Sequence, residues 1–210
     1  MKINISDMKA ADQKCQAIAD RVQKFTKTLY DFDSNGTIYA ESYRILQRDE
    51  IVSKFASELA PMCEEAAGVI QAAAEDAAEA IKRIDLSNPA DLTAALDAIQ
   101  AGMVHRETLE ALENVFRGRR QCQLILNSAL EHYKLSKIAV FDPLPAMHTA
   151  AAAIEAAGHY TNPADLFREL LKAQKAFNVL YKDAGTDYTA DWGLPVEEIK
   201  EADMRAAMGL

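Results

Sequence analysis

Apolar residues recur every three or four positions near the start of the chain. This heptad spacing predicts an amphipathic helix, which Ser6 or Asp7 can cap. The charged residues between them, Asp12 included, are expected to form a solvated face. Such a stripe can pack inside a bundle or form an intermolecular coiled coil. Its members are Met8, Ala11, Cys15, Ile18, Val22, Phe25 and Leu29.

A polar connector over Asp31–Tyr39 leads to a second helix that starts at about Glu41. Pro61 lies within its apolar pattern and predicts a kink or a break, after which the helix resumes to Ile84. Small inward-facing alanines in the second half would let a neighbouring helix approach closely. The inward positions are Ile45, Val52, Phe55, Leu59, Met62, Cys63, Ala66, Ile70, Ala73, Ala77 and Ile81.

The later helices are marked by their ends. The sequence Asn-Pro-Ala-Asp-Leu occurs at 88–92 and again at 162–166, and each copy combines a capping residue, Pro in the first turn and an acid. Between these starts we predict a long helix over 107–133 with Gly118 at its middle, and an alanine-rich helix that ends at Gly158.

Residues 186–210 form a tail of another kind, with no helical period until a short acidic helix begins at about Pro195. The tail holds the only tryptophan, Trp192. We therefore predict a helical bundle over 1–185, with an internal boundary near 85–88, followed by the tail. Two alternatives stand equally for Trp192: it anchors the tail on a second chain, or it folds back onto its own bundle.

Composition supports an all-α fold. The 210 residues include 38 alanines, the strongest helix formers, but only 8 glycines and 6 prolines, and no stretch alternates with period two. We predict an antiparallel bundle of six or seven helices, from which the N-terminal helical hairpin can extend. The three cysteines are expected to be buried reduced thiols.

Charge and hydropathy exclude some function classes. The net charge of −9 argues against non-specific nucleic-acid binding, and no apolar run nears the roughly 18 residues of a membrane helix. The N-terminus lacks the apolar core of a signal peptide, so we expect a cytoplasmic protein without membrane contact.

The segment 31–42 resembles the calcium loop of EF-hand proteins. Oxygen-bearing side chains stand at loop positions 1, 3 and 5 (Asp31, Asp33 and Asn35), Gly36 occupies position 6, and the carbonyl of Thr37 would be the next ligand. The twelfth position, where the resemblance requires a bidentate Glu, is Ser42. The alternative is a polar connector between helices, in which Gly36 adopts a positive φ.

Other chemistry is less marked. Arg117 and Arg120 would share one face of the predicted 107–133 helix and could bind a phosphate or an acidic partner helix. The alternative is solvated charge beside intramolecular acids. The four histidines lie in separate segments without a metal or nucleophile motif, so we expect no catalytic residues, although scattered residues of an all-α enzyme would leave no motif.

Three segments, 41–56 (ESYRILQRDEIVSKFA), 85–92 (DLSNPADL) and 109–121 (LEALENVFRGRRQ), resemble helical proteins encoded beside head genes in phages and prophages of gut bacteria. The resemblance implies a virion-assembly or capsid-associated role and carries over no functional residues. We therefore predict a non-enzymatic assembly or interaction protein that binds a protein partner or its own kind. The alternative is a calcium-responsive regulatory module that uses the 31–42 loop.

Overall fold

The computed structural model describes residues 5–35, 41–82, 89–140 and 142–195. Of these described residues, 80% are helical and none is in a strand, which confirms the all-α class and the expected number of helices. The seven helices are α1 (Ile5–Asn35), α2 (Glu41–Lys82), α3 (Pro89–Gln100), α4 (Arg106–Val115), α5 (Arg120–His132), α6 (Leu144–Ala157) and α7 (Pro163–Asp183).

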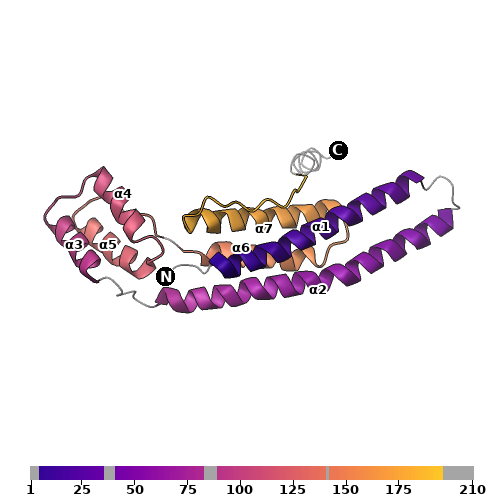
Figure 1. The fold of residues 1–210 in the computed structure, drawn as a ribbon, viewed down its shortest axis with the longest axis horizontal. Helices are drawn as coiled ribbons and strands as arrows, with labels where there is room; N and C mark the ends of the chain where they lie inside the picture. The colour runs from indigo at the N-terminus through magenta and orange to yellow at the C-terminus, as the bar shows by residue number, and fades with distance from the viewer. Residues whose placement is uncertain (1–4, 36–40, 83–88, 141, 196–210) are drawn as a thin grey trace.

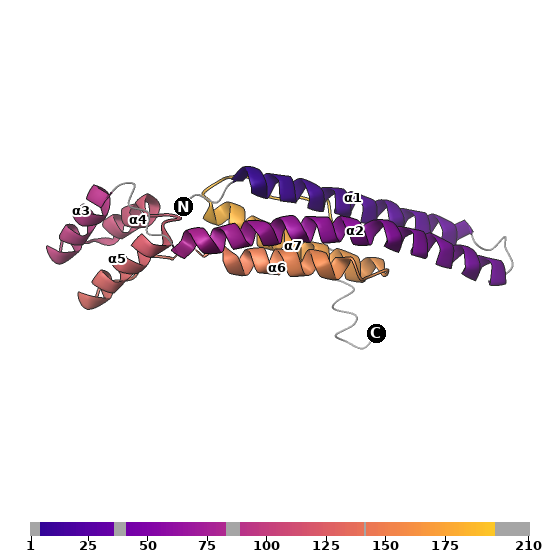
Figure 2. The same ribbon diagram turned by 90° about the horizontal axis from the view of Figure 1, so that it is seen from below.

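Four of the helices form an elongated antiparallel bundle. Helix α2 packs against α1 and α6, and α7 packs against α6 and α1 (Figure 1). Helices α1 and α2 extend past α6 and α7 on the side where α1 ends and α2 begins, as both views show (Figure 2). The extended N-terminal hairpin is thus present, but it forms half of the bundle rather than a separate unit.

The N-terminal helix buries its predicted seam. All seven seam residues, from Met8 to Leu29, are at most 5% exposed, and Phe25 stacks on Phe55 of α2 with ring centroids 3.7 Å apart. The heptad stripe therefore packs inside the chain's own bundle. Helix α1 begins at Ile5, before the expected caps, and continues to Asn35, into the expected connector.

Helix α2 does not break at Pro61. It runs without interruption for 42 residues. Pro61 itself is exposed to solvent, whereas Leu59 and Cys63, two residues before and after it, are buried. We attribute the continuity to this packing, which holds both halves of the helix against their neighbours. Of the predicted inward positions, Ile45 is an exception, since it is 55% exposed.

Helices α3, α4 and α5 form a second, smaller core at one end of the bundle (Figure 1). The prediction of one helix over 107–133 is wrong, because the segment forms two helices, α4 and α5. The chain turns between them at Gly118, whose φ of +76° lies in the left-handed region. The side-chain amide of Asn127 bonds both backbone groups of Ile138, which fixes the return of the chain toward α6.

This second core changes the domain prediction. Residues 85–88 lie outside the described residues, but the buried residues on either side of them belong to different cores. Because α6 and α7 return to the first core, α3–α5 form an insertion within the bundle rather than its second half. Residues 186–195 are irregular, as predicted, yet Ala190, Trp192 and Leu194 belong to the first core. The helix expected after Pro195 lies outside the described residues.

Candidate functional site

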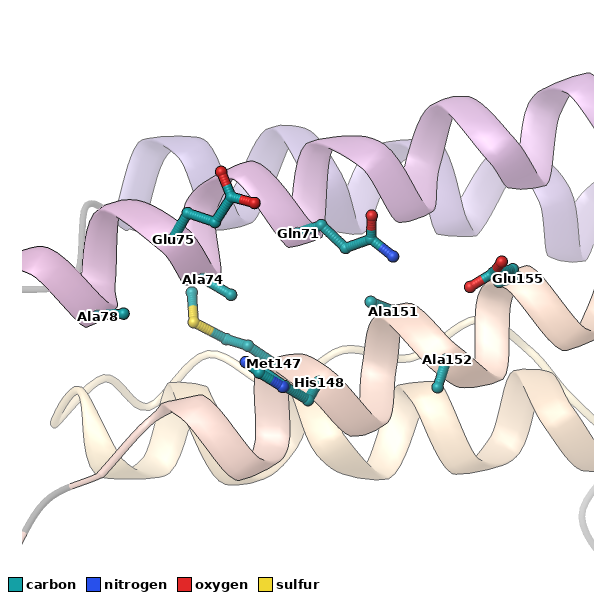
Figure 3. Close-up of a pocket in the computed structure, with 9 residues that line it drawn as sticks. All are labelled: Gln71, Ala74, Glu75, Ala78, Met147, His148, Ala151, Ala152 and Glu155. Carbon is teal, nitrogen blue, oxygen red and sulfur yellow. The ribbon is translucent and has the colours of Figure 1, made fainter.

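An open groove lies between α2 and α6, with a cavity volume of about 300 Å³. Alanines form much of its lining because both helices are alanine-rich where they face each other. Ala74, Ala151 and Met147 are buried there, and the Met147 side chain lies beside Ala74 (Figure 3). The volume is at the lower limit of pockets that bind small molecules.

Polar side chains line the two sides of this groove. Gln71 and Glu75 project from α2, and His148 and Glu155 project from α6 (Figure 3). All four are exposed. None of the described residues forms a cluster of three or more His, Cys, Asp or Glu side chains that could hold a metal ion. The groove therefore offers an apolar floor between two polar sides, each of which carries one glutamate.

The stretches of α2 and α6 that form the groove contain acidic residues but no lysine or arginine. From Phe55 to Ile81, α2 contains six acidic residues and no lysine or arginine, and α6 contains Glu155 but no lysine or arginine. Two of these acids face α1 instead, where Glu58 pairs with Arg21 and Glu65 with Lys14. An open groove with this excess of negative charge attracts cationic side chains.

A second notable cluster surrounds the carboxylate of Asp12, which is only 4% exposed. It accepts three hydrogen bonds: from the indole N–H of Trp192 at 2.7 Å, from the hydroxyl of Tyr188 at 3.0 Å and from that of Tyr181 at 3.1 Å. Burial, together with the charge of Asp12, raises the pKa of Tyr181 well above its ordinary value. The neutral hydroxyl is thereby kept as a donor.

These bonds attach residues 186–195, here called the C-terminal strap, to α1 and α7. Asn178 bonds both backbone groups of Ala190, and Gln23 donates to the carbonyls of Trp192 and Gly193. The Trp192 ring packs edge-on against Phe177 and is 1% exposed. The strap closes the side of the bundle between α1 and α7.

Trp192 is therefore not an exposed anchor for a partner chain. Of the two alternatives, the structure shows the one in which the tryptophan folds back onto its own bundle. The placement of Asp12 on a solvated face is also wrong. Both corrections have one cause, because the strap supplies hydrogen-bond donors that make a buried carboxylate tolerable.

The described part of the calcium segment is helical. Asp31, Asp33 and Asn35 form the last turn of α1, where Asn35 donates to the carbonyl of Asp31 and Asp33 pairs with Arg48 at 3.6 Å. Residues two apart on a helix point to opposite sides, so this turn does not converge on an ion as a calcium loop would.

Thr37, the remaining predicted calcium ligand, lies outside the described residues. Calcium binding by 31–42 therefore stays a prediction, which calorimetric titration of the chain and of a Ser42→Glu variant tests.

Arg117 and Arg120 do not share a helix face. Gly118 separates α4 from α5, so Arg117 follows α4 and bonds the side chain of Asn114 at 3.0 Å, while Arg120 opens α5 and pairs with Asp142 at 3.5 Å. The premise of a joint phosphate or acidic-helix site is thus wrong. Arg117 instead lies against Gly185 at the end of α7 and lines a pocket of about 210 Å³ between α4, α5 and α7.

The three cysteines are buried and form no disulfide, as expected. Burial raises the pKa of Cys63 to about 12, so the thiol stays protonated at neutral pH. The four histidines lie on separate elements, and only His148 belongs to the groove.

Neither the groove nor the Asp12 cluster was found from the sequence. The groove depends on how far apart two alanine-rich helices pack, and one-dimensional spacing does not determine that distance. The spacing of Asp12 did indicate that it could be buried. It stands four residues after Met8 and three before Cys15, so it lies next to the apolar seam of the first helix. Its three donors lie about 170 residues away in sequence and no local pattern joins them.

Comparison of the chain with family models, with curated proteins and with solved structures found no match. Among the described helices, none is both long and apolar enough to cross a membrane.

Proposed function

We propose that the protein is a non-enzymatic interaction protein that binds a basic helical segment of another protein in the groove between α2 and α6. The observation that carries the proposal is the combination in one groove of an alanine floor with Glu75 and Glu155 on opposite sides. An amphipathic helix laid into a groove is a recurring mode of peptide recognition.

The alanine floor supports a helical occupant because small side chains let a third helix approach two others closely. Met147 adds a flexible apolar side chain that can adapt to the occupant. The excess of acidic residues on α2 between Phe55 and Ile81 and the single charge of α6, Glu155, favour lysine and arginine on the partner. Such complementarity increases the association rate and selects the partner more than it adds affinity.

The resemblance to phage-encoded helical proteins extends this proposal to virion assembly. In a capsid-associated role, the acidic surface of the bundle would bind a basic segment of a structural subunit of the virion. Genes for capsid and portal proteins beside the gene of this chain would support that role. A neighbourhood without any virion gene would contradict it.

The interaction is tested by photo-crosslinking. A photoreactive residue replaces Ala152, an exposed residue of the groove, and in a matched variant it replaces Ala94, an exposed residue of α3. We expect position 152 alone to capture a discrete partner, whose binding is then measured with the purified proteins. Equal capture at both positions would contradict binding in the groove.

The charge argument is tested with that purified partner. The double variant Glu75→Gln/Glu155→Gln is expected to weaken binding about tenfold at low salt, with most of the effect on the association rate. Asp97→Asn/Glu107→Gln removes two exposed acids from α3 and α4 and serves as the matched control. Affinity that falls equally in both variants would show that only net charge matters and would refute recognition by the groove.

A further inference from the structure

The α1–α2 hairpin has an end that the other two helices of the bundle do not cover. Helix α6 ends beside Ala60 and Cys63: a Cβ placed on Gly158 would lie 3.7 Å from the Cα of Ala60 and 3.1 Å from the Cβ of Cys63. The part of α2 from Glu41 to about Ala60 therefore lies beyond α6. Figures 1 and 2 show this end of α1 and α2 projecting past α6 and α7 in both views.

Two large apolar side chains on this free end, Tyr30 and Ile45, occupy positions that are core-facing further along the same helices. Tyr30 stands 18 residues, or five helical turns, after the buried Asp12, and it is 72% exposed. Ile45 stands 18 residues before the buried Cys63 and is 55% exposed. Leu46, beside Ile45, is 67% exposed.

Tyr30 and Ile45 are exposed because the covering helices stop, whereas the inward-facing pattern of α1 and α2 continues. Asp12 faces α7 and the strap, and Cys63 faces the end of α6. Two helices packed side by side leave one apolar face open, and a four-helix section needs two more helices to cover it.

We propose that a second copy of this chain covers the face, with the two hairpin ends packed antiparallel about a two-fold axis. In such an isologous contact each copy supplies the two helices that the other lacks. The arrangement extends the four-helix core of each bundle into a shared four-helix section. It uses a surface distinct from the α2–α6 groove, so the two proposals stand or fall separately.

The charge of the hairpin end favours a second copy as the occupant. Residues 26–57 contain four basic and five acidic residues, whereas the whole chain has a net charge of −9. Two copies can therefore meet here with little net repulsion, and mixed signs on each copy can pair across the axis. Elsewhere on α2 the contact would place like charges together, because no basic residue lies between Phe55 and Ile81.

The size of the face predicts a weak but specific dimer. About 19 residues of α2 beyond α6 span roughly 28 Å at 1.5 Å per residue, and two adjacent helices are about 20 Å wide. The resulting face is on the order of 550 Å² per copy, or about 1,100 Å² in total, which is near the lower limit of specific interfaces. We therefore expect a monomer–dimer equilibrium in the micromolar range.

The test is sedimentation equilibrium of the full chain across that range. The variant Tyr30→Ser/Ile45→Ser is expected to weaken dimerisation at least tenfold while its helical circular dichroism stays unchanged. The matched control is Val115→Ser/Val179→Ser, which removes two apolar residues, 51% and 50% exposed, from α4 and α7. It should leave the equilibrium unchanged.

A second measurement locates the contact. Because the native thiols are buried, a Leu46→Cys variant presents one reactive thiol, and a bifunctional maleimide should link two copies through it. Val179→Cys is the control and should stay unlinked. A chain that stays monomeric up to about 100 μM overturns the proposal. A dimer that both double-serine variants weaken equally would also overturn the proposal. The same holds if the maleimide links two copies only through the control variant Val179→Cys.

Discussion

Removing the Asp12 carboxylate should release the C-terminal strap and destabilise the bundle. In the variant Asp12→Ala, the indole N–H of Trp192 and the hydroxyl of Tyr181 lose their acceptor while their side chains are 1% and 0% exposed. Tyr188 also loses its bond, but it is 44% exposed and its hydroxyl can bond to water.

The magnitude follows from these differences in burial. A buried donor left without a partner costs about 1–3 kcal/mol, so the two buried donors together cost roughly 2–6 kcal/mol, and the Tyr188 hydroxyl adds little. Folding of the variant no longer has to desolvate a carboxylate, which offsets part of this cost. We expect a net loss of about 3 kcal/mol in the free energy of unfolding, or a fall of about 6–12 °C in Tm.

The assay uses Trp192, the only tryptophan, as a reporter of the strap. Urea unfolding is followed by Trp192 fluorescence and, in parallel, by far-UV circular dichroism. In Asp12→Ala the emission should shift to the red before helicity is lost, because the strap opens before the bundle unfolds. In the unmodified protein the two transitions should coincide more closely.

Two conservative variants separate the hydrogen bonds from the packing. Asp12→Asn preserves the shape but places an amide N–H₂ among donors, so it should cost about 1–2 kcal/mol. Tyr188→Phe removes only the partly exposed donor and should cost less than about 1 kcal/mol. A loss below about 1 kcal/mol in Asp12→Ala, with unchanged emission, would refute the reasoning and leave apolar packing alone to hold the strap.

Three further predictions concern the core. Phe25→Ala and Phe55→Ala should each cost about 3–5 kcal/mol in urea unfolding, because both rings are buried and stack on each other; a loss under about 1 kcal/mol would contradict this. A thiol-specific chromogenic reagent should modify none of the three cysteines in the native protein and all three in denaturant, since all are buried. The free energy of unfolding should fall as pH rises above about 9: burial raises the pKa of Cys63 to about 12 and that of Cys15 above its ordinary value, so the unfolded chain loses these protons first. A urea midpoint that is constant from pH 7 to 10 would contradict this third prediction.

The sequence determined the fold class and most of the helices. Heptad spacing predicts the buried seam of α1, and the second Asn-Pro-Ala-Asp-Leu sequence predicts the start of α7, where the Asn162 side chain accepts the backbone N–H of Ala164. These features are local: side-chain periodicity, capping and the entropy of alanine act within one or two turns. A pattern of that range can be interpreted without knowing the neighbours of the helix.

Tertiary structure decided the features that depend on distant partners. Pro61 was expected to kink or break α2, and the helix is unbroken there because the packing of Leu59 and Cys63 holds it through the proline. Trp192 and Asp12 are 180 residues apart; the sequence placed Asp12 on a solvated face and left Trp192 equally between a partner chain and its own bundle. The open groove and the uncovered hairpin end arise because helices of unequal length pack side by side. A periodic pattern shows which face of a helix is apolar, but only the packed chain shows where a neighbouring helix ends and leaves that face exposed.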